Sequence, residues 1–445
     1  MDLEFPKEFN WGASTSAYQI EGAWDREGKG QSIWDTFSHT PGKVHGGDTG
    51  DMACNHYDLY KRDVALMKDL GLDAYRFSTA WTRLFPNGRG KPNRVGRDFY
   101  DRLIDDLLAN DIAPWLCFYH WDLPQALQDM GGWASRDTVY FYADYVAYVA
   151  EQFGDRVDTF IMLNEPNIAA LLGHLLGLHA PGLTDMMAFG AAAHHLNLAT
   201  GIGLERLRSE NSGWQLGTIL SLQPVHPETD SDEDIGAAQL FDAVYNRSFL
   251  DPLLKGSYPE QTAGMLEFHV QDNDLKTIQQ PIDFLGVNLY TRLLVKADPS
   301  SLIGMGQAEP PESAKLTDMG WEVYPDALYE QLMDLKDNYD NPTVYITENG
   351  GAFPDKLENG RVHDLDRIAY FEAYLSAVHR AMTEGVDVKG YFAWSLLDNF
   401  EWADGYSKRF GITYVDYATQ TRYPKDSYYW YQELIQNGGF NERFS

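Results

Sequence analysis

The chain has 445 residues, and its 35 Lys and Arg residues against 66 Asp and Glu residues give a formal net charge of −31. A hydrophobic content of 44%, including 14% aromatic residues, supplies material for a core and excludes a disordered chain. The excess of acid argues against nucleic acid as a partner, because phosphate binding needs clustered Lys and Arg. The same charge disfavours polyanionic ligands, so uncharged small molecules remain the best candidates.

The cysteines and the N-terminus indicate the compartment. Cys54 and Cys117 are too few for a disulfide framework, and Cys117 lies in an apolar run, so we expect a buried, reduced thiol there. Residues 1–4 are acidic and lack the basic and apolar regions of a signal peptide. No run of about 18 strongly apolar residues occurs in the sequence, so we expect no membrane span and a cytoplasmic protein.

Eight short apolar runs recur along the chain, at residues 9–13, 74–78, 113–119, 159–163, 216–222, 284–290, 343–347 and 390–395. Several are apolar on both faces, as strands of a covered parallel sheet are. Amphipathic segments lie between them; residues 98–110 and 364–384, for example, place apolar side chains three and four positions apart. Eight strands alternating with helices predict an α/β fold, a closed (β/α)8 TIM barrel formed as a single domain by residues 1–445.

The active site of such a barrel lies at the C-terminal ends of its strands, where the connecting loops converge. These positions carry polar and aromatic residues in chain order: Gln19 beyond the first run, Arg76 within the second, His120 and Trp121 after the third, Asn164 and Glu165 after the fourth, Asn288 and Tyr290 in the sixth, Glu348 after the seventh and Trp394 in the eighth. Seven unrelated strand ends would not all suit one polyhydroxylated ligand. The pattern therefore predicts a sugar site.

Two of these strand-end residues are glutamates. Glu165 belongs to an Asn-Glu-Pro sequence and Glu348 to a Thr-Glu-Asn-Gly sequence, and each directly follows an apolar run. Paired carboxyl groups cleave glycosidic bonds, because one donates a proton to the departing oxygen while the other attacks the sugar or activates water. Either residue alone is equally well explained as a solvated or ion-paired glutamate. The two together, on strands four and seven among amides and aromatic side chains, favour catalysis.

Sequence motifs along almost the whole chain resemble those of glycoside hydrolase family 1, the family that includes many β-glucosidases. The motifs occur in the family's order, at residues 9–22, 75–78, 119–124, 164–166, 179–182, 347–350 and 394–402. The resemblance implies that Glu165 is the general acid/base and Glu348 the nucleophile, with their carboxyl groups about 5–5.5 Å apart and the anomeric configuration retained. It also implies that Asn164 binds the sugar 2-hydroxyl and that Arg76 and Tyr290 keep Glu348 ionised.

Further residues are implied to bind the substrate. Three of them would hold the 3-, 4- and 6-hydroxyls of the cleaved sugar: Gln19, His120 and Glu401. Trp394 would stack under the sugar ring, and Trp402 would donate through its indole N–H. Trp321 resembles the platform on which the leaving group rests. The remaining members of the set are Trp121, Asn288, Tyr290 and Phe410.

The resemblance implies a retaining, exo-acting β-glucosidase that acts on β-glucosides and on cello-oligosaccharides such as cellobiose, with side activity on β-galactosides or β-fucosides. Two alternatives remain, a 6-phospho-β-glycosidase and a catalytically inactive sugar-binding protein on the same fold. Glu401 disfavours the first, because a carboxylate repels phosphate, and Lys408 and Arg409 are expected to face solvent or the barrel rim. Loss of a catalytic glutamate would be needed for the second. A thioglucosidase is disfavoured, because such relatives carry Gln in place of Glu165.

No cofactor and no metal are expected. His194 and His195 are adjacent, but neighbouring residues of a helix face different directions, and no second pair has the spacing of metal ligands. A small-molecule substrate is therefore the expected partner, and a homo-oligomer remains open.

Overall fold

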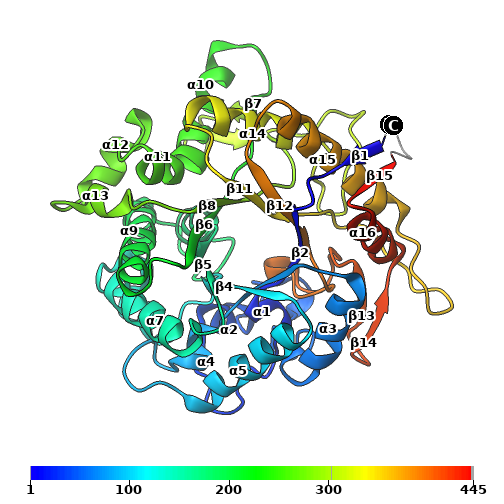
Figure 1. Ribbon diagram of the computed structural model, residues 1–445. Coiled ribbons are helices and arrows are strands. Elements are labelled where there is room, and N and C mark those ends of the chain that lie inside the picture. Colours follow the sequence, from blue (N-terminus) through cyan, green and yellow to red (C-terminus); the bar gives the residue numbers. More distant parts are fainter. Residues whose placement is uncertain (1, 302, 442–445) are drawn as a thin grey trace.

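The computed structural model describes residues 2–301 and 303–441. Parallel strands close into a central barrel (Figure 1), paired in the order β11-β12-β2-β3-β4-β5-β6-β8. The barrel strands are β2 (Asn10–Ser14), β3 (Ala74–Ser78), β4 (Ala113–Tyr119), β5 (Thr159–Asn164), β6 (Gln215–Ser221), β8 (Phe284–Asn288), β11 (Val344–Asn349) and β12 (Val388–Trp394). Helices surround the strands, so the predicted (β/α)8 TIM barrel is confirmed.

Helices lie between the barrel strands and after the last of them, and the longer ones surround the barrel (Figure 1). They are α1 (Ala17–Ile20), α2 (Ile33–Ser38), α3 (His56–Leu70), α4 (Trp81–Leu84), α5 (Arg94–Ala109), α6 (Gln125–Gln128), α7 (Asp137–Phe153), α8 (Pro166–Ala170), α9 (Met186–Glu210), α10 (Asp232–Asp242), α11 (Ser248–Leu254), α12 (Glu260–Leu266), α13 (Asp274–Ile278), α14 (Asp326–Asn338), α15 (Leu365–Thr383) and α16 (Asp426–Asn437). The predicted helices at 98–110 and 364–384 correspond to α5, which begins four residues earlier, and to α15.

Several short strands and helical turns lie outside the barrel sheet. β1 (Asp2–Glu4) pairs with β15 (Gly439–Asn441), β13 (Thr413–Asp416) pairs with β14 (Thr421–Pro424), and a side sheet has the order β10 (Met305–Gln307), β9 (Leu293–Ala297), β7 (Val225–Pro227). The turns are η1 (His45–Gly47), η2 (Gly132–Ala134), η3 (Leu171–Leu175), η4 (Ala243–Arg247), η5 (Glu267–His269) and η6 (Trp402–Asp404). The side sheet follows β6 and β8, next to the predicted site.

The ends of the barrel strands lie within two residues of the predicted ends. Three placements relative to the strands are wrong: β8 ends before Tyr290, and Asn164 and Glu348 lie inside β5 and β11 rather than after them. The reason lies in contacts with segments far away in the sequence. The N–H of Leu289 donates to the carbonyl of Glu348 (3.1 Å), and the carbonyl of Tyr290 accepts the hydroxyls of Tyr370 (2.9 Å) and Tyr374 (2.8 Å). These bonds lengthen one strand and turn the other away from the barrel.

The barrel interior is a packed core, and a larger core lies between the strands and the helices. The interior side chains are Ala74, Trp115, Cys117, Ile161, Ile219, Phe284 and Phe392. Cys117 is thus the buried thiol that was expected, and Cys54 is also buried and free. Gly12 on β2 is required by this packing, because a Cβ atom there would lie 2.2 Å from the Phe392 ring. The close packing of side chains inside the barrel therefore leaves room only for glycine at position 12.

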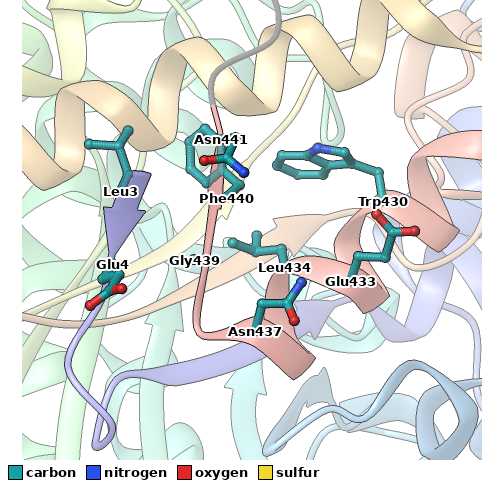
Figure 2. A pocket seen from close by; sticks show the side chains of 9 residues that line it. All are labelled: Leu3, Glu4, Trp430, Glu433, Leu434, Asn437, Gly439, Phe440 and Asn441. Carbon is teal, nitrogen blue, oxygen red and sulfur yellow. The ribbon is translucent and has the colours of Figure 1, made fainter. Parts of the chain in front are cut away.

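Every helix in residues 2–301 and 303–441 is too short or too polar to cross a membrane. A pocket of about 250 Å³ lies between β1, β15 and α16 (Figure 2). Its lining includes Glu4, Trp430, Glu433 and Phe440, and it contains no predicted site residue. The predicted site residues lie instead at the C-terminal ends of the barrel strands and in the loops that follow them.

Candidate active site

Glu348, on β11, receives a strong donor on each carboxylate oxygen. Arg76, on β3, donates from Nη1 to Oε1 at 2.5 Å, and the hydroxyl of Tyr290 donates to Oε2 at 2.5 Å. The Arg76 side chain is fully buried, and Glu348 is 3% exposed. The structure thus places both predicted partners on Glu348. A buried carboxylate held at both oxygens has a fixed direction, which a nucleophile needs.

Asn164 and Asn288 link Glu348 to Glu165. Arg76 Nη2 donates to Asn164 Oδ1 (2.5 Å), and Asn288 Nδ2 donates to Asn164 Oδ1 (3.0 Å) and to Glu165 Oε1 (2.7 Å). The Thr347 hydroxyl donates to Asn288 Oδ1 at 2.7 Å, which fixes the orientation of that amide. Since Asn288 occupies Oε1 of Glu165, the second carboxyl oxygen is left to carry a proton.

The backbone of Glu165 has a positive φ of 47°, immediately before Pro166 begins α8. Its N–H donates to the Ile219 carbonyl on β6 at 2.9 Å. A left-handed non-glycine residue costs about 1–3 kcal/mol and persists only where surrounding contacts hold it. Here the proline, the backbone bond and Asn288 together direct the carboxyl group toward the site.

Burial and charge set different protonation states for the two glutamates. Burial raises the pKa of Glu165 to about 8, and the charge of Glu348 adds to the rise. Burial also raises the pKa of Glu348, but Arg76 and the Tyr290 hydroxyl act against that rise. The Arg76 cation and the Tyr290 hydroxyl both donate to Glu348, whereas Glu165 accepts only from the neutral amide of Asn288. The pair therefore favours an ionised Glu348 beside a protonated Glu165, with apparent pKa values that belong to both groups.

His120 presents a free donor at the mouth. Asn164 Nδ2 lies 2.9 Å from His120 Nε2, and Asn164 Oδ1 already accepts from Arg76. An amide NH₂ only donates, so His120 Nε2 must accept and Nδ1 must carry the hydrogen. Burial and Arg76 lower the pKa of His120 well below its usual value, so the ring is neutral. Nδ1 is buried without a hydrogen-bond partner among the described residues, which suits a ligand hydroxyl.

Glu401 presents the complementary acceptor. Its Oε2 is buried and has no hydrogen-bond partner within residues 2–301 and 303–441. Burial, followed by the charges of Asp404, Glu348 and Glu165, raises the pKa of Glu401 well above its usual value. A ligand group with a further negative charge is thus disfavoured next to Glu401, whereas a neutral hydroxyl could donate to its Oε2.

Gln19, on α1, lies beside Glu401 but is already bonded. Its amide donates to Asn399 Oδ1 (3.0 Å) and to the Phe400 carbonyl (2.9 Å), and its Oε1 accepts from Ser16 at 2.6 Å. A sugar hydroxyl can reach only the second lone pair of Oε1, unless these bonds rearrange. Gln19 also fixes the loop that carries Glu401, which the sequence did not indicate.

Two aromatic groups flank the carboxylates. In the first, the His120 ring is 6.1 Å from Trp394 and 5.8 Å from Trp402, both at an interplanar angle of 24°, and Trp121 is 4.6 Å from Trp402. The indole N–H of Trp121 donates to the Asn164 carbonyl at 3.0 Å, so Trp121 fixes the backbone of Asn164.

The second aromatic group lies on the side of Tyr290. The Tyr290 ring is 5.4 Å from Trp321 and 6.0 Å from Phe410, and Trp321 is 6.1 Å from Phe410. Trp394 joins the same apolar cluster. Trp321 is partly exposed in this cluster, which leaves a face for a ligand.

Several supporting residues were missed by sequence reasoning. Thr347 directs Asn288, and Tyr370 and Tyr374 both donate to the Tyr290 carbonyl. The four-residue spacing of the two tyrosines on α15 was the available signal, because such residues share one helix face. Nothing in the sequence indicated that this face meets Tyr290.

The basic residues near Glu401 are occupied by other partners. Lys408 Nζ donates to the Asp318 carbonyl at 2.5 Å, and this side chain is 22% exposed. The expectation that Arg409 faces solvent or the rim is wrong: its Nη1 donates to the buried Asp398 Oδ2 at 2.6 Å. The buried carboxylate attracts the guanidinium inward. Neither cation is free to bind a phosphate.

His194 and His195 take part in helix packing. His194 lies 2.9 Å from Asp274 and 2.8 Å from the Tyr258 hydroxyl, and His195 Nδ1 lies 2.9 Å from the Trp133 carbonyl. The described part of the chain contains no group of three or more His, Cys, Asp or Glu side chains arranged for a metal ion.

The chain is similar to known proteins both in sequence and in structure. A family model described as glycosyl hydrolase family 1 matches residues 1–440. Beta-glucosidase A of Acetivibrio thermocellus is 47% identical over 98% of this chain and 99% of its own. A bifunctional beta-D-glucosidase/beta-D-fucosidase of Bifidobacterium breve is 48% identical over 98% and 99%. A Thermotoga maritima family 1 glycoside hydrolase, solved with a cyclophellitol analogue as transition state mimic, superposes with a TM-score of 0.95 at 46% identity, covering 99% and 100%.

Proposed function

The chain belongs to glycosyl hydrolase family 1, and on this basis we propose that it is a retaining, exo-acting β-glucosidase. It removes terminal, non-reducing β-D-glucosyl residues from β-glucosides and cello-oligosaccharides such as cellobiose. One observation carries the proposal: two buried glutamates lie at the ends of the fourth and seventh barrel strands and are held by different partners, Arg76 and Tyr290 on Glu348 and Asn288 on Glu165.

In the proposed mechanism, Glu165 gives its proton to the glycosidic oxygen as the bond to the anomeric carbon breaks. Glu348 attacks that carbon from the opposite face and forms a covalent glycosyl-enzyme. Glu165, now ionised, takes a proton from water, and the water oxygen displaces Glu348. Each displacement inverts the carbon, so the product retains the β configuration. Arg76 and Tyr290 hold Glu348 in position for the attack.

We propose that the unpaired polar atoms at the mouth recognise the sugar. His120 Nδ1–H donates to one hydroxyl, and Glu401 Oε2 accepts from another. Asn164 lies between both glutamates and binds the 2-hydroxyl, where contacts strengthen in the transition state. Trp394 stacks under the ring and Trp402 donates its indole N–H. Gln19 completes the polar set through the second lone pair of Oε1.

The other predicted residues support these. Asn288 orients Glu165, Trp121 fixes Asn164, and Trp321 with Phe410 supports the leaving group. Because the proposed site draws on residues from Gln19 to Phe410, we propose that the whole chain acts as one catalytic domain. A cytoplasmic location stays a prediction, which cell fractionation measures, and sedimentation determines the oligomeric state.

A comparison of glycosides that differ at the 4- and 6-positions tests the proposed function. Glucosides and fucosides are expected to be cleaved well, galactosides less well, and 6-phosphoglucosides essentially not. The phosphate adds about −1.5 to −2 charges beside Glu401, while Lys408 and Arg409 are engaged elsewhere. The measurement is kcat/KM for the nitrophenyl series. A value for the 6-phosphoglucoside equal to or above that of the glucoside would establish the phospho-glycosidase instead.

The pH dependence of kcat/KM is expected to be bell-shaped. Glu348 must lose its proton to attack, so activity rises as pH passes the lower apparent pKa. Glu165 must keep its proton to act as an acid, so activity falls above the upper value, near 8. Removing the Glu348 charge by Glu348→Gln should lower the pKa of Glu165, as followed by carbon-13 NMR of its carboxyl group. An unmoved Glu165 titration would contradict the coupling.

A further inference from the structure

We propose that Arg292 and Glu322 are positioning residues for Trp321, and that their ion pair sets the preference for substrates with a bulky leaving group. The inference rests on the proposed function, in which Trp321 supports the leaving group. Glu322 follows Trp321 directly in the chain, and Arg292 follows the segment that carries Tyr290. The pair therefore joins the platform to the segment that contacts Glu348.

The ion pair has the geometry of a fork. Arg292 Nε donates to Glu322 Oε2 at 2.7 Å, and Nη2 donates to Oε1 at 3.1 Å. The two side chains are only 17% and 11% exposed. A two-point bond between planar groups fixes direction as well as distance, and partial burial limits its screening by salt.

Arg292 is held from its other sides as well. Its guanidinium carbon lies 4.0 Å from the centre of the Tyr324 ring, and Nη1 lies 3.1 Å from His226 Nδ1. A guanidinium has no acceptor, so His226 Nδ1 must accept and its Nε2–H must donate to Glu330, at 2.8 Å. His226 on β7 and Glu330 on α14 thereby fix the position of Arg292, which in turn binds Glu322.

The backbone around Trp321 transmits this constraint. The Thr291 hydroxyl donates to the Glu322 carbonyl at 2.8 Å, and the Thr317 N–H donates to the Trp321 carbonyl at 2.8 Å. The Trp321 side chain itself is partly exposed and is in contact with Tyr290 and Phe410. Its direction therefore depends on the loop, and the loop is tied to the barrel through Glu322.

Tyr290 does not depend on the fork in the same way. The hydroxyls of Tyr370 and Tyr374 hold its carbonyl, and its own hydroxyl is bonded to Glu348. Loosening the Arg292–Glu322 pair should thus disturb the leaving-group side while leaving the nucleophile in place. The expected signature is a loss that depends on the size of the leaving group.

The experiment compares cellobiose with β-glucosyl fluoride, which has no leaving group large enough to rest on Trp321. Arg292→Lys keeps the charge but removes the fork. We expect kcat/KM for cellobiose to fall about tenfold, within the range found for coupled neighbours, and that for the fluoride to change less than about twofold. Glu322→Gln should give the same split, and it serves if the first variant does not fold.

Two controls make the outcome specific. In a Trp321→Ala background, Arg292→Lys should cause no further loss on cellobiose, because its target is gone. Arg26→Lys removes a similar fork, in which Arg26 bonds Asp58 at 2.7 and 3.1 Å and lies 5.4 Å from the Tyr57 ring, and should change neither substrate. Equal losses on both substrates, or an undiminished loss without Trp321, would overturn the inference. If the unaltered protein cleaves neither substrate, the proposed function fails instead.

Discussion

Replacing Glu348 by Gly is expected to lower kcat/KM on a β-glucoside by at least about 10⁴-fold, because no other group can attack the anomeric carbon. Arg76 and Tyr290 both donate to this carboxylate, and both would lose that acceptor. The measurement is steady-state hydrolysis of a nitrophenyl β-glucoside. Activity within about tenfold of the unaltered protein would contradict the role of Glu348.

Chemical rescue separates loss of the nucleophile from loss of the fold. The Gly side chain leaves room for a small anion such as azide to attack from the same face. Azide should then restore turnover of an activated glucoside and give the α-glucosyl azide, because a single displacement inverts the carbon. A folded variant that azide cannot rescue would indicate that the position does not face the anomeric carbon.

Replacing Glu165 by Ala should have the second-largest effect, and the effect should depend on the leaving group. General acid catalysis contributes about 10²–10⁴-fold where the departing oxygen needs a proton. Cellobiose, whose leaving group is a poor one, should lose activity by this factor. A dinitrophenyl glucoside should still form the glycosyl-enzyme rapidly, because its dinitrophenolate group leaves without protonation. The comparison is between kcat/KM values for the two substrates.

The pH profile of the same variant provides the control. The alkaline limb, assigned to Glu165 with its pKa of about 8, should disappear in Glu165→Ala, while the acid limb of Glu348 should remain. Equal losses on cellobiose and on the dinitrophenyl glucoside would show that Glu165 is not the proton donor. A surviving alkaline limb would assign it to another group.

The sequence could predict the barrel and the position of both glutamates because these depend on local patterns. Short apolar runs define the strands, and Glu165 and Glu348 come at the strand ends where a barrel gathers its chemistry. A local pattern could also show that the two lie on strands four and seven. A local pattern could not give the state of each proton. The resemblance implied an ionised Glu348, and in the structure the proton states depend on burial and on the contacts of Arg76 and Asn288 from other strands.

The errors and omissions arise where distant segments meet. Tyr290 was placed in a strand because its run is apolar, yet hydroxyls from residues 80 and 84 positions away turn its backbone out of the barrel. Arg409 was expected at the surface because most cations are solvated, but the buried Asp398 attracts it inward. Gln19 belongs to a motif expected to bind sugar, yet its amide also donates to the Phe400 carbonyl and so holds the loop that carries Glu401. Each of these contacts joins residues that are not neighbours in the chain, so the local sequence does not indicate it.

The anomeric form of the first product tests the proposed mechanism most directly. Two successive displacements at one carbon, the first by Glu348 and the second by water activated by Glu165, must release β-glucose from a β-glucoside. Proton NMR during the first minutes of hydrolysis, before mutarotation mixes the anomers, distinguishes the two forms. We predict that the β-anomer appears first. First appearance of the α-anomer would mean that water attacks directly, and it would contradict a nucleophilic role for Glu348.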